Sequence, residues 1–161
     1  MNIDAYAWFI VKSAGDFSSE TGYICNGDNT VFDPKEFTET VGQEPSKCWK
    51  YGDKRESSAS RKNQETSYLF SAWFSEQVEA NGDDVYEMCD KLVDMFEPYV
   101  EGMAAFRQKY DVIFEIEIVL YKVGMETNGL FFSHRLIDFC NRTGTEIDVN
   151  TMFASDTTHG K

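Results

Sequence analysis

Between residues 112 and 121 apolar side chains alternate with acidic ones, and this alternation constrains the fold more than any other feature of the sequence. It predicts a β-strand in which Glu115 and Glu117 share one face and the intervening apolar side chains share the other. A strand of this kind belongs to a sheet that packs on a core with one face and meets water with the other. The residues predicted to face the core are Phe114, Ile116, Ile118 and Leu120.

Three other segments are predicted to be strands. Residues 5–12 are apolar on both faces, which favours a position in the middle of a sheet. Residues 68–74 and 145–153 are predicted to be the other two strands. The Gly-rich stretch 13–30 is predicted to be a long loop, or a short hairpin around residues 22–25.

Capping residues mark two short helices. Asp33 is predicted to cap the first helix, with Glu36 completing a capping box and Gly42 ending the helix. Ser133 is predicted to cap a later helix that ends near Gly144.

The longest helical stretch lies between residues 84 and 110. Asp84 and Glu87 are expected to form a capping box at its start, and Pro98 is expected to divide it into two helices. Apolar residues at helical spacing predict the faces that pack on the core. These residues are Val85, Met88, Cys89, Leu92, Phe96, Tyr99, Met103, Phe106 and Tyr110, and in the last helix Leu136, Ile137 and Cys140.

These elements follow the order β-α-β-α-α-β-α-β and predict an α+β fold. The economical arrangement is a single, mostly antiparallel or mixed sheet of about four to five strands with helices packed on it. Each end of the chain carries a strand, a Phe followed by a capping residue, a short helix and a Gly, which suggests a pseudo-repeat. We expect residues 1–154 to form one domain and residues 155–161 to form a flexible C-terminal tail.

The N-terminal sequence and the cysteines favour a cytoplasmic protein. The first residues lack the basic and apolar segments of a signal peptide, and the longest apolar runs are too short to span a bilayer, so no membrane association is expected. The four cysteines and two histidines show no metal-ligand spacing. The cysteines are therefore predicted to be free thiols, and no metal, cofactor or catalytic set is expected.

The chain is strongly acidic, with 28 Asp and Glu residues against 15 Lys and Arg residues and a net charge of −13. A general nucleic-acid-binding surface is not expected, because such binding needs many cations to displace counterions.

The segment 45–64 is predicted to be a loop, and residues 47–62 within it hold six basic residues against two acidic ones. We call residues 47–62 the basic loop.

The basic loop is a candidate site for an anionic metabolite or nucleotide. Lys and Arg neutralise phosphate, and an aromatic face stacks on a base. The alternative is that Trp49 anchors the loop to the core and the cations are solvated. The candidate ligand-binding or partner-binding residues are Trp49, Lys50, Tyr51, Asp53, Lys54, Arg55 and Arg61.

Four carboxylates form a second candidate surface. Glu115 and Glu117 share the polar face of one predicted strand, and Glu146 and Asp148 share that of another. If the two strands are neighbours, the four side chains cluster. Such a cluster would bind a divalent metal or face a basic protein, and the alternative is a solvated sheet face.

Two motifs carry a family resemblance. Residues 45–53 follow the pattern P-[ST]-x-x-W-x-x-G-[DE], and residues 32–38 follow F-[DS]-P-x-x-[IF]-[ST]. In these motifs and in the order of its elements the chain resembles the bacterial domain-of-unknown-function family 4279. The resemblance supports the fold and implies no catalytic residue. Small proteins of this kind are sometimes grouped with immunity or conflict-system proteins, which suggests a bacterial or phage origin.

The sequence therefore favours a non-catalytic binding protein over an enzyme. The leading interpretation is an immunity-like or inhibitor-like protein whose acidic surface recognises a protein partner with a basic surface. A module that binds a small anionic ligand through the basic loop is the second interpretation, and a carboxylate enzyme that uses a metal is the third. The sequence does not decide whether the protein forms a homodimer through a sheet edge.

Overall fold

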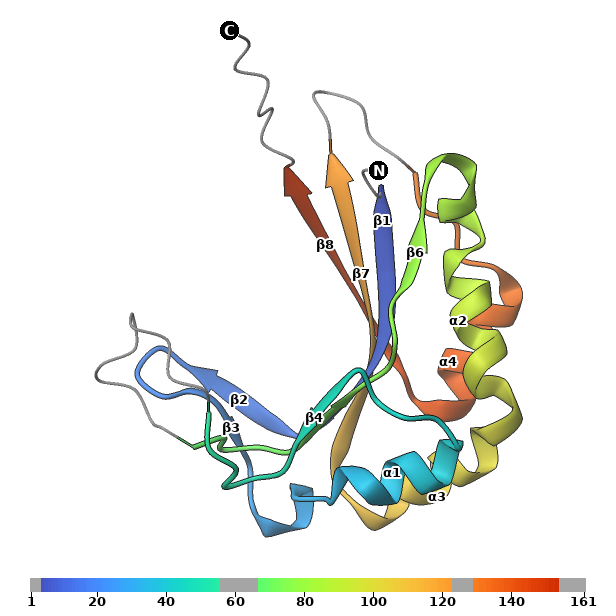
Figure 1. The fold of residues 1–161 in the computed structure, drawn as a ribbon. Coiled ribbons are helices and arrows are strands. Elements are labelled where there is room, and N and C mark those ends of the chain that lie inside the picture. The colour runs from blue at the N-terminus through green and yellow to red at the C-terminus, as the bar shows by residue number, and fades with distance from the viewer. Residues whose placement is uncertain (1–3, 56–66, 123–128, 154–161) are drawn as a thin grey trace, which may run out of the picture.

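The computed structural model describes residues 4–55, 67–122 and 129–153 and contains a mixed β-sheet with helices packed on one side (Figure 1). The predicted α+β class and mixed sheet are confirmed. The strands are β1 (Ala5–Ser13), β2 (Gly15–Ser18), β3 (Gly22–Cys25), β4 (Lys47–Trp49), β5 (Ala72–Phe74), β6 (Val78–Ala80), β7 (Val112–Lys122) and β8 (Glu146–Phe153). The helices are α1 (Pro34–Val41), α2 (Met88–Phe96), α3 (Val100–Lys109) and α4 (His134–Thr143), with 3₁₀ turns at Asp28–Thr30, Gly82–Tyr86 and Glu97–Tyr99.

The sheet is built around β1, as the apolar character of that strand predicts. The strand order is β4-β5-β1-β7-β8, and β6 pairs with β1 on the same side as β5. β1 and β7 run antiparallel over nine residue pairs, from Ala5 opposite Leu120 to Ser13 opposite Val112. β7 and β8 are parallel and are joined through α4, because a parallel pair needs a crossover connection.

One face of the sheet carries the core, and the four helices cover that face (Figure 1). Phe9 lies at the centre of an aromatic cluster, with its ring centroid 4.7 Å from that of Phe96 and 5.5 Å from that of Phe114. The rings of Phe37 and Phe139 lie farther out at 6.3 and 6.4 Å. The alternation predicted for residues 112–121 is confirmed. The residues predicted to face the core are buried against the helices, namely Phe114, Ile116, Ile118 and Leu120.

The helix ends show which capping predictions are correct. The side chain of Asp33 accepts a hydrogen bond from the amide of Lys35, and that of Ser133 accepts one from the amide of Leu136. Gly42 and Gly144 end α1 and α4 in the left-handed conformation, with φ of 64° and 69°. These predictions are confirmed because each depends on only a few neighbouring residues.

Both predicted capping boxes are wrong. Glu36 does not turn back to the helix start, because its carboxylate binds Lys109 and the Tyr110 hydroxyl at the end of α3. The predicted box at Asp84 and Glu87 is replaced by a 3₁₀ turn, and α2 begins at Met88 without a side-chain cap.

Five short strands lie in segments with weaker sequence signals. Residues 47–49, predicted to be loop, form β4, which pairs with β5. The predicted strand 68–74 is regular only over 72–74, and β6 follows it. In the Gly-rich stretch the hairpin alternative is correct, since β2 and β3 pair with each other.

The apolar stripe of α4 is shifted from its predicted position. Leu136 and Phe139 are buried, whereas Ile137 is 55% exposed.

The two units of the suggested pseudo-repeat share their helix caps but differ in how the following strand joins the sheet. The chain after α4 pairs directly with β7, but the chain after α1 forms β4, which is separated from β1 by β5. In the part of the chain that the structure describes, no helix is long and apolar enough to cross a membrane.

We predict that Phe9→Ala lowers the free energy of unfolding by about 3–5 kcal/mol, because it removes a fully buried ring from the centre of the core. Urea unfolding followed by circular dichroism measures this loss. Phe17→Ala is the matched control, because the Phe17 ring is 78% exposed on β2, and we expect a change below about 0.5 kcal/mol. Similar losses in the two variants would contradict the central position of Phe9.

Candidate functional site

The second face of the sheet lies opposite the four helices, and within the described ranges no helix covers it (Figure 1). We call it the open face. Strand alternation places Tyr6, Trp8 and Lys12 of β1 on this face, opposite Val119, Glu117 and Ile113 of β7. The β2–β3 hairpin projects away from the helices on this side of the sheet (Figure 1). The open face is therefore a surface with half-buried aromatic rings and charged groups.

The four predicted carboxylates lie together on the open face. β7 and β8 are neighbours, with Glu115 opposite Glu146 and Glu117 opposite Asp148. Glu146 and Asp148 are exposed, whereas Glu115 and Glu117 are partly buried. Among the residues that the structure describes, no group of three or more His, Cys, Asp or Glu side chains is arranged to hold a metal ion.

The two inner carboxylates bind groups of the protein itself. Glu117 accepts a hydrogen bond from the Trp8 indole at 2.5 Å and one from the Asn150 amide at 3.1 Å. Glu115 forms an ion pair with Lys12 at 3.3 Å, and its side chain is 13% exposed. Burial raises the pKa of Glu115, and the nearby charge of Lys12 opposes this rise without cancelling it. Asp148 also accepts a hydrogen bond from the Asn150 side chain, at 3.2 Å, but both outer carboxylates, Glu146 and Asp148, are exposed and so available to a partner.

A row of aromatic rings crosses the open face from β1 towards β4. The centroid of Trp8 lies 5.9 Å from that of Tyr6 and 5.0 Å from that of Phe74, and Phe74 lies 5.4 Å from Trp49. The Lys47 ammonium lies 4.2 Å from the centroid of Phe74 and 4.6 Å from that of Trp8. The face is thus acidic along β7 and β8 and cationic at β4.

Within the basic loop, the residues that follow β4 form a tight turn fixed by hydrogen bonds. The carboxylate of Asp53 accepts from the amide of Lys50 at 2.8 Å. The backbones of Gly52 and Asp53 exchange hydrogen bonds with that of Tyr68, each at 2.8 Å. Asp53 therefore stabilises the turn, and Arg61 lies outside the described residues.

Trp49 anchors the turn to the protein, which was the alternative interpretation from the sequence. Its ring stacks on that of Tyr68 at 4.2 Å with an interplanar angle of 12°, and it also contacts Phe70. Arg55 lies over the ring of Tyr68, with its guanidinium carbon 4.9 Å from the centroid. Tyr51 is 46% exposed and has no ring contact within the described residues.

A cavity of about 360 Å³ lies at the outer edge of β4. Lys54 and Arg55, both predicted as site residues, line this cavity together with Lys47 and Tyr68. Lys47 belongs to the basic loop but was not among the predicted site residues, and Tyr68 was predicted to lie in a strand. The only sequence signal for Tyr68 was its aromatic character, because its position beside Trp49 depends on the pairing of distant segments.

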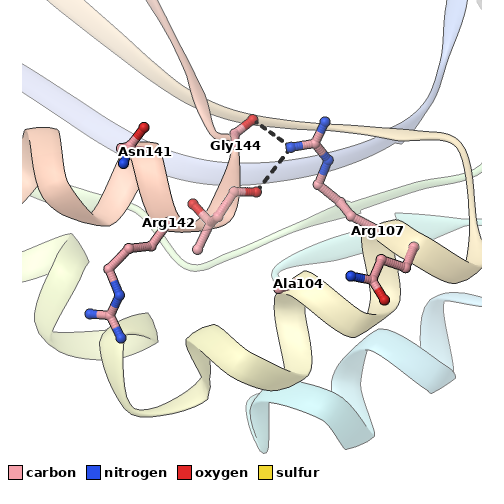
Figure 2. A pocket seen from close by; sticks show the side chains of 7 residues that line it. Ala104, Arg107, Asn141, Arg142 and Gly144 are labelled. Atoms are coloured by element: carbon pink, nitrogen blue, oxygen red, sulfur yellow. Dashed lines mark hydrogen bonds between the residues drawn. The ribbon is translucent and has the colours of Figure 1, made fainter.

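A second hollow lies between α3 and α4 (Figure 2). There the Arg107 guanidinium donates hydrogen bonds to the carbonyl oxygens of Thr143 and Gly144, both at 3.1 Å. A cation at the C-terminus of a helix satisfies carbonyl groups that have no partner within the helix. Arg107 therefore fastens α3 to the end of α4, and this hollow has a structural explanation.

The four cysteines are free and differ in exposure. Cys89 is buried, and burial raises its pKa to about 12. Burial likewise raises the pKa of Cys140 to about 11. Both are poor nucleophiles at neutral pH, because the thiolate is the reactive form. Cys48 is exposed and lines the cavity beside β4.

The chain belongs to the family described as "Domain of unknown function (DUF4279)", whose family model matches residues 23–154. The resemblance inferred from the sequence motifs is thus confirmed. The match includes β4, the turn that follows it and both acidic strands, β7 and β8, and it begins after β1 and β2. No curated protein and no solved structure matches the chain.

The burial of Glu115 leads to a prediction about pH. A carboxyl group with a raised pKa in the folded state destabilises the fold when it ionises, so stability falls as the pH rises above the ordinary value of 4.5. Because Glu115→Gln cannot ionise, we expect its stability relative to wild type to increase between about pH 4 and pH 7. Urea unfolding at each pH measures the difference. Exposed Glu79→Gln is the control and should show no comparable trend, and a pH-independent difference for Glu115→Gln would contradict the prediction.

We also predict that Gly144→Ala destabilises the protein more than Gly42→Ala. Both substitutions place a Cβ in a left-handed conformation, which costs about 1–2 kcal/mol. Only at Gly144 does the added Cβ overlap the Arg107 guanidinium, whereas at Gly42 it meets Tyr99 at an ordinary 3.6 Å. Thermal unfolding should show the excess loss in wild type and not in an Arg107→Ala background. An excess that persists without Arg107 would contradict this explanation.

Proposed function

We propose that the protein is a non-catalytic binding protein that recognises a basic protein partner through its open face. The observation that carries this proposal is that the open face presents exposed Glu146 and Asp148 on β8 and the half-buried rings of Tyr6 and Trp8 on β1, with only β7 between the two strands. Protein interfaces combine an aromatic centre with a polar rim, and complementary charge brings the partner to it.

The overall charge supports the same proposal. A net charge of −13 attracts a basic partner over distances longer than direct contacts, and this attraction weakens as salt screens it. An immunity-like or inhibitor-like role, in which the chain masks a cationic surface of another protein, fits this charge. The family resemblance supports a bacterial or phage setting, and the exposed free thiol of Cys48 supports a reducing, cytoplasmic one.

The chemistry of the open face supports a binding role without catalysis. Its two inner carboxylates are already bound by Lys12, Trp8 and Asn150, so they serve to hold the surface in place. A partner's Lys or Arg side chains would meet the outer carboxylates, and its apolar side chains would meet the aromatic row. The open face therefore fits a protein that binds a partner better than one that catalyses a reaction.

The proposal predicts that reversing the outer charges abolishes partner binding. Immobilised full-length wild type should retain its partner from a lysate of the native host at low salt, and should lose it as salt rises. Glu146→Lys combined with Asp148→Lys should lose the same protein. With the purified partner, titration calorimetry should show an affinity at least about tenfold weaker.

The matched control is Glu39→Lys combined with Glu101→Lys. These two exposed carboxylates lie on α1 and α3, on the helix-covered side, so the control changes the net charge by the same amount. It should keep the partner with an affinity close to wild type. Equal binding by both double variants, or equal loss in both, would overturn the assignment of the open face.

A further inference from the structure

The cavity at the outer edge of β4 is a second feature, and it does not depend on the proposed protein partner. Its volume of about 360 Å³ lies within the range of small-molecule sites. It is bounded by β4 on one side and by the turn from Asp53 to Arg55 and the ring of Tyr68 on the other. Every one of these boundary residues lies in the part of the chain that the structure describes.

The charge of the cavity is opposite to that of the protein. Lys47, Lys54 and Arg55 line it, against the single carboxylate of Asp53. One oxygen of that carboxylate accepts a hydrogen bond from the amide of Lys50. None of the three cations forms an ion pair within the described residues. Three cationic residues line this cavity although the chain as a whole carries a net charge of −13.

Two side-chain N–H groups of the cavity residues are buried without an acceptor. These are the indole nitrogen of Trp49 and Nε of Arg55, which find no hydrogen-bond partner in the described ranges. A buried donor without a partner is unfavourable, and a ligand oxygen would satisfy it. The two unpartnered N–H groups and the three cations would therefore bind the same kind of group, which is an oxyanion.

The aromatic rings narrow the class of ligand further. Tyr68 lies between Arg55 on one face and Trp49 on the other, so both faces of its ring are occupied. A planar base cannot enter this stack without displacing one of them. The stack instead fixes the guanidinium of Arg55, which is the side chain best suited to bind a phosphate or carboxylate with two hydrogen bonds.

We propose that the cavity beside β4 binds a small molecule through a phosphate or carboxylate group, held by Lys47, Lys54 and Arg55. The sequence had pointed to Lys50 and Tyr51 as well, but neither lines the cavity. In this proposal the cavity recognises the anionic group of the ligand, and no aromatic ring of the cavity stacks on a nucleobase.

Cys48 provides a direct measurement at alkaline pH, because this residue is exposed and lines the cavity, although burial raises the pKa of its thiol. The full-length protein is alkylated with iodoacetamide in the presence of inorganic phosphate or of succinate, with chloride at matched ionic strength as the reference. Mass spectrometry follows the rates at Cys48 and at Cys25, which lies on β3 outside the cavity. At about 10 mM anion, a site with a Kd of about 1 mM is nine-tenths filled, so alkylation of Cys48 should slow about tenfold while that of Cys25 stays unchanged.

The variant Lys54→Gln with Arg55→Gln should lose this protection, and circular dichroism should show that it is folded. The control variant Lys35→Gln with Lys91→Gln removes two exposed cations from α1 and α2 and should keep the protection. Protection by phosphate alone would identify a phosphate ligand, and protection by succinate alone a carboxylate ligand. Protection by neither anion, or protection that persists in the Lys54→Gln, Arg55→Gln variant, would overturn the proposal.

Discussion

The antiparallel pairing of β1 with β7 is the constraint on which the rest of the structure depends. β1 is paired along both edges, with β7 on one side and β5 and β6 on the other. A strand held in this way has a fixed register, and a shift by one residue would move every side chain to the opposite face. The pairing therefore sends Phe9 into the core and Trp8 to the open face. Both the core and the candidate binding surface follow from this single register.

The two faces are stabilised by different physical interactions. On the helix side, stacked, tilted and edge-on aromatic rings around Phe9 exclude water. On the open face, partly buried polar groups are satisfied by one another, as in the hydrogen bond from Trp8 to Glu117 and the ion pair of Lys12 with Glu115. Such groups are costly to bury alone, so the network keeps the open face ordered without a layer of helices.

Patterns that extend over a few residues were predicted well. The alternation of apolar and acidic residues in β7 and the N-caps at Asp33 and Ser133 are correct, because each depends on neighbours within one or two turns of chain. The capping boxes failed where a distant group competed, as Lys109 did for Glu36. The strand β4 was missed because a three-residue edge strand carries almost no periodicity and is defined by its partner β5.

By itself the sequence determined the α+β class, the family, the two faces of β7 and the concentration of cations in the basic loop. Only the tertiary structure decided which of those groups meet. It placed β8 beside β7, so that Glu117 lies opposite Asp148, and it folded the turn after β4 against Tyr68 to form the cavity. The physical reason is that local side-chain patterns act within one element, whereas a site requires contacts between segments that are far apart in the chain. Those contacts are fixed by strand register and core packing, which depend on all the elements at once.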